Sequence, residues 1–128
     1  MTAPDIVSVD ETNFEYQVVA YSQDVPVLVD FWATWSDASQ RISPLLENLA
    51  RKTGGSFRLA KLNVDENKKI TDRYQVNTVP TLAVFENGQI SHQMVGSKSN
   101  HQVISFVNRT IPGPGNLQLE KAAAQYQK

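Results

Sequence analysis

Apolar side chains recur along the chain with two different periods, which separates predicted strands from predicted helices. Runs that are apolar and rich in β-branched residues predict five strands, at residues 7–9, 25–32, 57–64, 81–85 and 89–94. The run at 25–32 is apolar apart from Asp30 and Pro26, which is typical of a central strand covered on both faces. Glu86-Asn87-Gly88 predicts a tight turn that joins the last two strands as a hairpin.

Apolar positions three and four residues apart predict helices between these strands. The clearest spans residues 39–53, where five apolar residues share one face: Ile42, Leu45, Leu46, Leu49 and Ala50. Asp10 or Thr12 can cap an earlier helix, residues 66–74 form a short one, and a last helix begins near Asn100.

The order of these elements defines the fold class. Strands joined through helices pair in parallel, and the hairpin adds an antiparallel edge. We therefore predict an α/β fold with a mixed central sheet and helices on both faces, over residues 1–111. Pro112-Gly113-Pro114-Gly115 ends this domain, and residues 112–128 form a linker and a helix-prone tail that we expect to be frayed.

Charge and cysteine content exclude several classes of function. The 128 residues include 12 Lys and Arg and 13 Asp and Glu, and this balance predicts binding to neither nucleic acid nor an anionic membrane. The absence of cysteine excludes disulfides, thiolate metal sites and cysteine nucleophiles. His92 and His101 lack a third ligand nearby, so we expect no metal site and no cofactor. With neither a secretory signal nor a membrane-spanning run, a soluble cytoplasmic protein is expected. We also expect it to be a monomer.

Four motifs occur in a characteristic order. They are Val29-Asp30-Phe31-Trp32-Ala33-x-Trp35, Ile42-x-Pro44, Lys61-Leu62-Asn63-Val64-Asp65 and Val79-Pro80-Thr81, and Gly88 and Gly96 fit the same spacing. Over residues 5–111, this combination resembles the thioredoxin family. The resemblance implies the thioredoxin fold, a cis bond before Pro80, and thiol–disulfide oxidoreductase activity as the activity of the family.

The chain departs from the family at the reactive centre. Trp35-Ser36-Asp37-Ala38-Ser39 stands where the family pattern is Trp-Cys-Gly-Pro-Cys. Disulfide exchange requires a thiolate, and a serine hydroxyl neither ionises near neutral pH nor forms a mixed disulfide. We therefore expect Ser36 and Ser39, at the positions of the catalytic cysteines, to be redox-inactive.

Asp30 and the two serines then need another interpretation. The resemblance makes Asp30 the proton acceptor for the second cysteine, and without sulfur we expect a buried acid that is neutral or hydrated. A serine nucleophile would need a base within hydrogen-bond reach, and neither histidine is expected near it. We expect Ser36 and Ser39 instead to bind backbone amides at the start of the helix.

A binding surface can outlast the loss of redox chemistry. Trp35, Val79, Pro80 and Gly96 resemble the surface on which the family docks extended protein or peptide segments, through contacts that need no sulfur. We favour a naturally redox-inactive binding protein, because Asp37 and Ala38 also depart from the pattern. Two alternatives stay open: an oxidoreductase whose cysteines were replaced by serine, and a module of a longer chain divided at the Pro-Gly linker.

Overall fold

The apolar runs fold into five strands of one sheet. They are β1 (Ile6–Ser8), β2 (Val27–Trp32), β3 (Arg58–Asn63), β4 (Thr81–Glu86) and β5 (Gln89–Val95). The computed structural model describes residues 5–111, so the predicted linker and tail at 112–128 lie outside the described residues. The strand order is β1-β3-β2-β4-β5, with β3 parallel to β1 and β2, and β4 antiparallel to β2 and β5. This is the predicted mixed α/β sheet.

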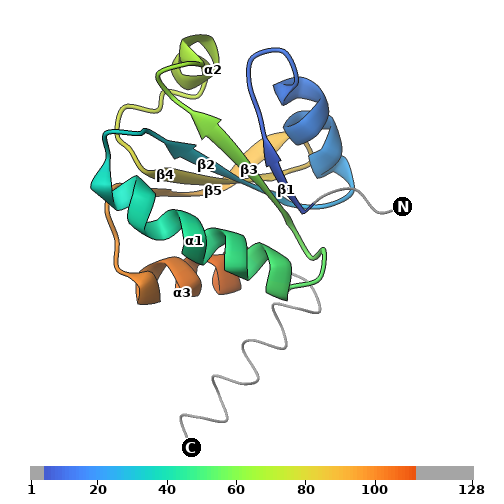
Figure 1. Ribbon diagram of the computed structural model, residues 1–128. Coiled ribbons are helices and arrows are strands. Elements are labelled where there is room, and N and C mark those ends of the chain that lie inside the picture. Colours follow the sequence, from blue (N-terminus) through green and yellow to red (C-terminus); the bar gives the residue numbers. More distant parts are fainter. Residues whose placement is uncertain (1–4, 112–128) are drawn as a thin grey trace, which may run out of the picture.

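Helices cover both faces of the sheet (Figure 1). One layer holds α1 (Asp37–Lys52) and α3 (Asn100–Thr110), and the other holds η1 (Glu15–Ala20) and α2 (Lys68–Arg73). The first helix is a π-helix that continues into a 3₁₀ turn, η2 (Tyr21–Gln23). Its N-cap residue is Phe14, which makes no side-chain cap, so the predicted cap by Asp10 or Thr12 was wrong; Asp10 Oδ1 instead accepts the amides of Thr12 and Asn13 in the preceding turn. In the described part of the chain, every helix is too short or too polar to cross a membrane.

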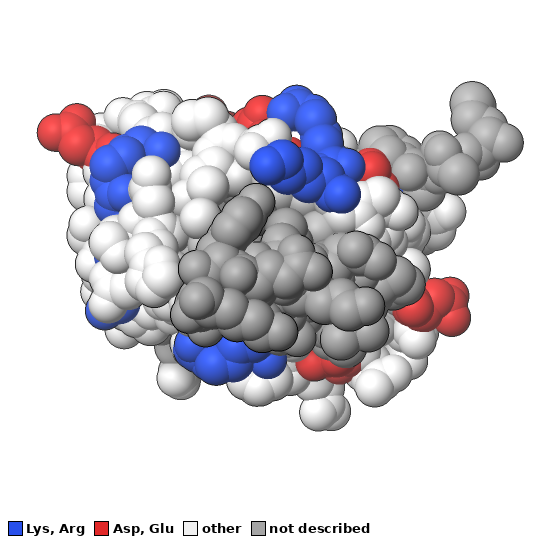
Figure 2. Space-filling model, turned by 90° about the horizontal axis from the view of Figure 1, so that it is seen from below, with Lys and Arg blue, Asp and Glu red and all other residues white. Residues whose placement is uncertain are grey.

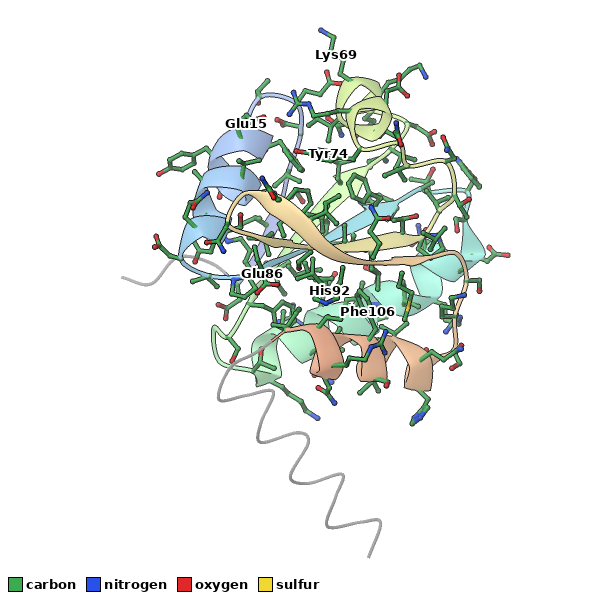
Figure 3. The ribbon with its side chains drawn as sticks, turned by 180° about the vertical axis from the view of Figure 1, so that it is seen from behind. Glu15, Lys69, Tyr74, Glu86, His92 and Phe106 are labelled. Atoms are coloured by element: carbon green, nitrogen blue, oxygen red, sulfur yellow. The ribbon has the colours of Figure 1, made fainter. Side chains whose placement is uncertain are left out.

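The alternating side chains of β2 divide the core in two. Leu28 packs with α1 and α3, whereas Val29 and Phe31 pack with η1 and α2. Figure 3 shows the same division, with Tyr74 on one side of the sheet and Phe106 on the other. β2 is buried on both faces, which confirms the prediction that this segment is a central strand.

The hairpin contains a β-bulge that the alternation of the sequence does not predict. Asn87 and Gly88 both have positive φ, as a two-residue hairpin turn of type I′ requires. The pairing register then shifts between Val84 and Phe85. As a result, Ile90 and Met94 contact opposite cores, although four residues of regular strand would place them on the same face.

The strand register brings three loops to one end of the sheet. Phe31 of β2 pairs with Thr81 of β4, and Thr81 pairs with Val95 of β5. The end of β2, the start of β4 and the end of β5 are therefore neighbours. The loops at 33–36, 74–80 and 96–99 meet there, at the left of Figure 1.

Candidate functional site

Ser36 and Ser39 lie at the beginning of α1, and their hydroxyls differ in hydrogen bonding. Ser36 is the N-cap residue, and its Oγ accepts a hydrogen bond from the Ser39 amide at 3.1 Å, which confirms the expected capping role. The expectation for Ser39 was wrong. It lies in the first turn of the helix, it is 1% exposed, and its Oγ has no hydrogen-bond partner among the described residues. Its amide is the group that is capped, while its own side chain points into the core.

Asp30 is a fully buried acid in the centre of β2. Neither carboxyl oxygen has a hydrogen-bond partner among residues 5–111. Burial raises the pKa of Asp30 to about 7, with the nearby charge of Lys61 opposing this shift and that of Glu47 reinforcing it. The predicted buried acid is therefore present, and its neutral form is favoured far more than that of an exposed aspartate.

Lys61 lies beside Asp30 across the β2–β3 pair, but its ammonium group is directed toward α1. Its Nζ donates to Glu47 Oε2 at 2.8 Å and to Ser43 Oγ at 2.6 Å. The hydrogen bond from Lys61 lowers the pKa of Glu47. Sequence analysis assigned no role to Lys61 or Glu47. The available signal was a lysine within an otherwise apolar strand.

Trp35 presents its ring to solvent in a fixed orientation. It is 67% exposed, and its indole Nε1 donates to Asp65 Oδ2 at 2.8 Å. The Asp65 amide in turn donates to Asn63 Oδ1, which holds the loop after β3 in place. Sequence analysis used Asp65 only as part of a motif and missed its role in orienting Trp35.

The Val79-Pro80 segment lies against the loop after β5. The bond between Val79 and Pro80 is cis, and the Gly96 amide donates to the Pro80 carbonyl at 2.8 Å. Gly96 has a φ of 90°, a backbone conformation that favours glycine. Within the described residues, neither the N–H nor the C=O of Val79 makes a hydrogen bond. One donor and one acceptor are thus left for an incoming chain.

Arg41 joins α1 to the loop after β5. Its guanidinium donates to Asn100 Oδ1 at 2.7 Å and also to the Lys98 carbonyl. These contacts fix the segment that follows Gly96 relative to the helix that follows Trp35. Sequence analysis missed Arg41, because an exposed arginine on a helix carries no sign of a partner almost sixty positions away.

Two exposed apolar side chains lie at this end of the molecule. Among the described residues, the large hydrophobic side chains with high exposure are Tyr16, Trp35 and Val95; Trp35 lies in the loop after β2, Val95 ends β5 beside it, and Tyr16 lies on η1. His92 and His101 are exposed side chains of β5 and α3. Residues 5–111 contain no group of three His, Asp or Glu side chains that could hold a metal ion. The layer of α1 and α3 presents side chains of both charges in Figure 2.

Comparisons with known proteins agree with this geometry. The Thioredoxin family model matches residues 5–109. Thioredoxin from Haemophilus influenzae is 34% identical over 107 residues, which cover 84% of this chain and 98% of that protein. Thioredoxin from Pseudomonas aeruginosa is 38% identical over 106 residues, covering 83% and 96%.

A longer relative matches as well. The bifunctional thioredoxin reductase/thioredoxin of Mycobacterium leprae is 32% identical over 106 residues, which make up 23% of that protein. The fold and the arrangement of the three loops define a domain of the thioredoxin class. The chain belongs to the thioredoxin family.

Proposed function

We propose that this protein is a redox-inactive member of its family that binds extended polypeptide segments. The binding site is the docking surface, which we define as Trp35, Val79, Pro80 and Gly96; Pro80 is buried, so it shapes this surface from beneath. The observation that carries the proposal is the backbone of Val79, which pairs with no other described residue and lies at the same end of the sheet as the exposed ring of Trp35. The two features supply main-chain hydrogen bonds and apolar contact, which together recognise an extended chain.

The backbone of Val79 is suited to strand addition. A residue before proline is restricted to extended conformations, because the proline ring clashes with a helical predecessor. An extended residue with a free N–H and a free C=O can pair with a partner strand as a sheet edge does. The hydrogen bond between Gly96 and Pro80 holds this segment in place before a partner arrives, which lowers the ordering cost of binding.

Disulfide exchange, the chemistry of the family, is not possible without sulfur. The chain has no cysteine, and Ser36 and Ser39 occupy the start of α1 where disulfide exchange would require sulfur. Ser36 Oγ is 3.1 Å from the Ser39 amide and acts as a helix cap. A docked segment would therefore be bound and released without a covalent intermediate.

Binding of an unfolded polypeptide tests this proposal. Reduced, carboxymethylated α-lactalbumin is a thiol-free unfolded chain, and its affinity is measured by calorimetry for the wild type, Trp35→Ala and Tyr16→Ala. We expect the Trp35 variant to bind about tenfold more weakly or worse, as loss of a central aromatic contact typically causes. Tyr16 is 76% exposed on η1 and serves as the matched aromatic control, which should bind like the wild type. Equal affinities for all three proteins would contradict the proposal.

A second candidate is an oxidoreductase in which serine has replaced both cysteines. Asp30 favours it, because a buried acid with a pKa near 7 contributes nothing to segment binding and suits proton transfer near neutral pH.

A cytoplasmic location and a monomeric state stay predictions from the sequence. Sedimentation of the purified chain tests the second of these.

A further inference from the structure

A hollow adjoins the docking surface on the face of the sheet opposite α1. It lies between the segment that precedes Val79 and the edge strand β5, which is nearest the viewer in Figure 3. Its volume is about 150 Å³. Because a molecule of liquid water occupies about 30 Å³, the hollow has room for a side chain of several heavy atoms.

The lining of this hollow is uncharged and combines carboxamide and hydroxyl groups with the apolar side chains of Val76 and Val95. Gln75, Asn77 and Gln93 line it together with Thr78 and Val95, and none of its described lining residues is ionisable. Each carboxamide carries both donors and an acceptor. Within residues 5–111, the side chains of these three residues make no hydrogen bond. The hollow therefore offers hydrogen bonds of both kinds and no counter-ion.

The hollow is continuous with the docking surface through two chain neighbours. Thr78 precedes Val79, and Val95 precedes Gly96. The Thr78 methyl group lies 3.9 Å from the position that a Cβ on Gly96 would occupy. Successive side chains of an extended segment point to opposite sides. A segment that pairs with Val79 can thus send one side chain into the hollow while its neighbours point elsewhere.

We propose that this hollow is a specificity subsite that takes an asparagine or glutamine side chain of the docked segment. The proposal rests on the proposed function. A carboxamide can pair with the carboxamides of the lining as both donor and acceptor. A carboxylate or ammonium group would lose hydration without meeting an opposite charge, and an aliphatic side chain would leave the polar lining without partners. The subsite selects segments by what it excludes as well as by what it binds.

Peptide selection followed by a charge swap tests this subsite. Cysteine-free random peptides of roughly ten residues, a length that spans such a surface, are selected on the wild type. We expect Asn or Gln to be enriched at one fixed position. Changing that residue to Glu should weaken binding to the wild type about tenfold, the size of one lost uncharged hydrogen-bond pair with its desolvation penalty.

Two protein variants establish where the preference arises. Gln93→Lys places an ammonium group in the lining and should reverse the preference, so that the Glu peptide binds better than the Gln peptide. Gln89→Lys, an exposed residue of the same strand outside the lining, should leave the preference unchanged. Equal binding of the Gln and Glu peptides to the wild type, or a reversal in both variants, would overturn the subsite.

The outcomes separate the two proposals. Peptides that bind in a Trp35-dependent way without any preference for Asn or Gln would overturn the subsite and leave the docking surface standing. If no peptide binds, or if binding is unaffected by Trp35→Ala, both proposals fall.

Discussion

At the residue scale, the buried Asp30 lowers the free energy of unfolding. Its buried carboxyl group accepts no hydrogen bond from any residue in the range 5–111, and such an environment strongly disfavours the charged form. The nearby Lys61 ammonium group is bound by Glu47 and Ser43, so it compensates Asp30 only through space. Because burial raises the pKa in the folded state alone, the stability of the protein must depend on pH around neutrality.

We expect Asp30→Asn to stabilise the protein, and more so at high pH. In the unfolded chain the pKa of Asp30 is near 3.8, and in the folded state it is about 7. Stability is therefore lost as pH rises between these values, and the loss is constant above them. The gain from the variant should be larger by about 2–3 kcal/mol at roughly pH 8.5 than at roughly pH 5. Urea unfolding at both pH values measures this difference.

The exposed Asp24 provides the control. Its change to Asn should have a small effect that is the same at both pH values. An Asp30 variant whose effect is also independent of pH would show that Asp30 is hydrated or paired in solution.

The sequence predicted the role of a residue only where that role depends on its near neighbours in the chain. Ser36 was identified as a helix cap because capping depends on residues three positions apart. Ser39 has the same side chain, but its environment depends on how α1 packs against the sheet, which local sequence does not specify. Asp65 and Arg41 act on partners about thirty and sixty positions away, and no single-chain pattern marks such pairs.

At the element scale, the start of α1 depends on one of its two serines. Ser36 Oγ satisfies an amide at the free helix end, whereas Ser39 Oγ is buried without a partner in the described part of the chain. The long strands and helices were predicted with small errors at their ends. The bulge in β5 and the π-helical turn of η1 were not predicted. Both depend on tertiary packing, which the spacing of apolar residues along the sequence does not reveal.

We expect Ser36→Ala and Ser39→Ala to differ in stability. Loss of the cap should lower the free energy of unfolding by about 1 kcal/mol. Removal of the unpartnered hydroxyl from Ser39 should leave stability unchanged or increase it, because the hydroxyl loses hydration on folding without gaining a hydrogen bond. Thermal unfolding of the two variants beside the wild type measures both effects. Equal losses in the two variants would show that Ser39 also binds an amide.

At the scale of the whole molecule, the scaffold of a thioredoxin surrounds a centre without sulfur. The start of α1, the buried Asp30 and the loop at Pro80 are the elements to which the family resemblance assigns disulfide exchange. The free end of a helix favours a thiolate, because its amides carry partial positive charge. Residues 36–39 depart from the reactive pattern of the family, so restoring sulfur there tests whether the surrounding scaffold still supports the reaction.

We expect the double variant Ser36→Cys, Ser39→Cys to reduce a small aromatic disulfide in excess dithiol faster than the wild type, which should not exceed background. Asp37 lies between the two positions, and its negative charge should keep the thiolate fraction low. Adding Asp37→Gly and Ala38→Pro should raise the rate further. Activity in the simple double variant favours replaced cysteines, and activity only after all four changes favours a site lost naturally. No activity in either would show that the scaffold no longer supports the reaction.

The central claim is that extended segments bind at the docking surface without sulfur chemistry. The most direct measurement is an NMR titration of the isotope-labelled protein with reduced, carboxymethylated α-lactalbumin. We predict that the largest chemical-shift changes occur at the Val79 and Gly96 amides and at the indole N–H of Trp35, which donates to Asp65 in the free protein. No change at these groups at saturating concentrations, or changes centred on η1 and β1 at the far side of the molecule, would contradict the account.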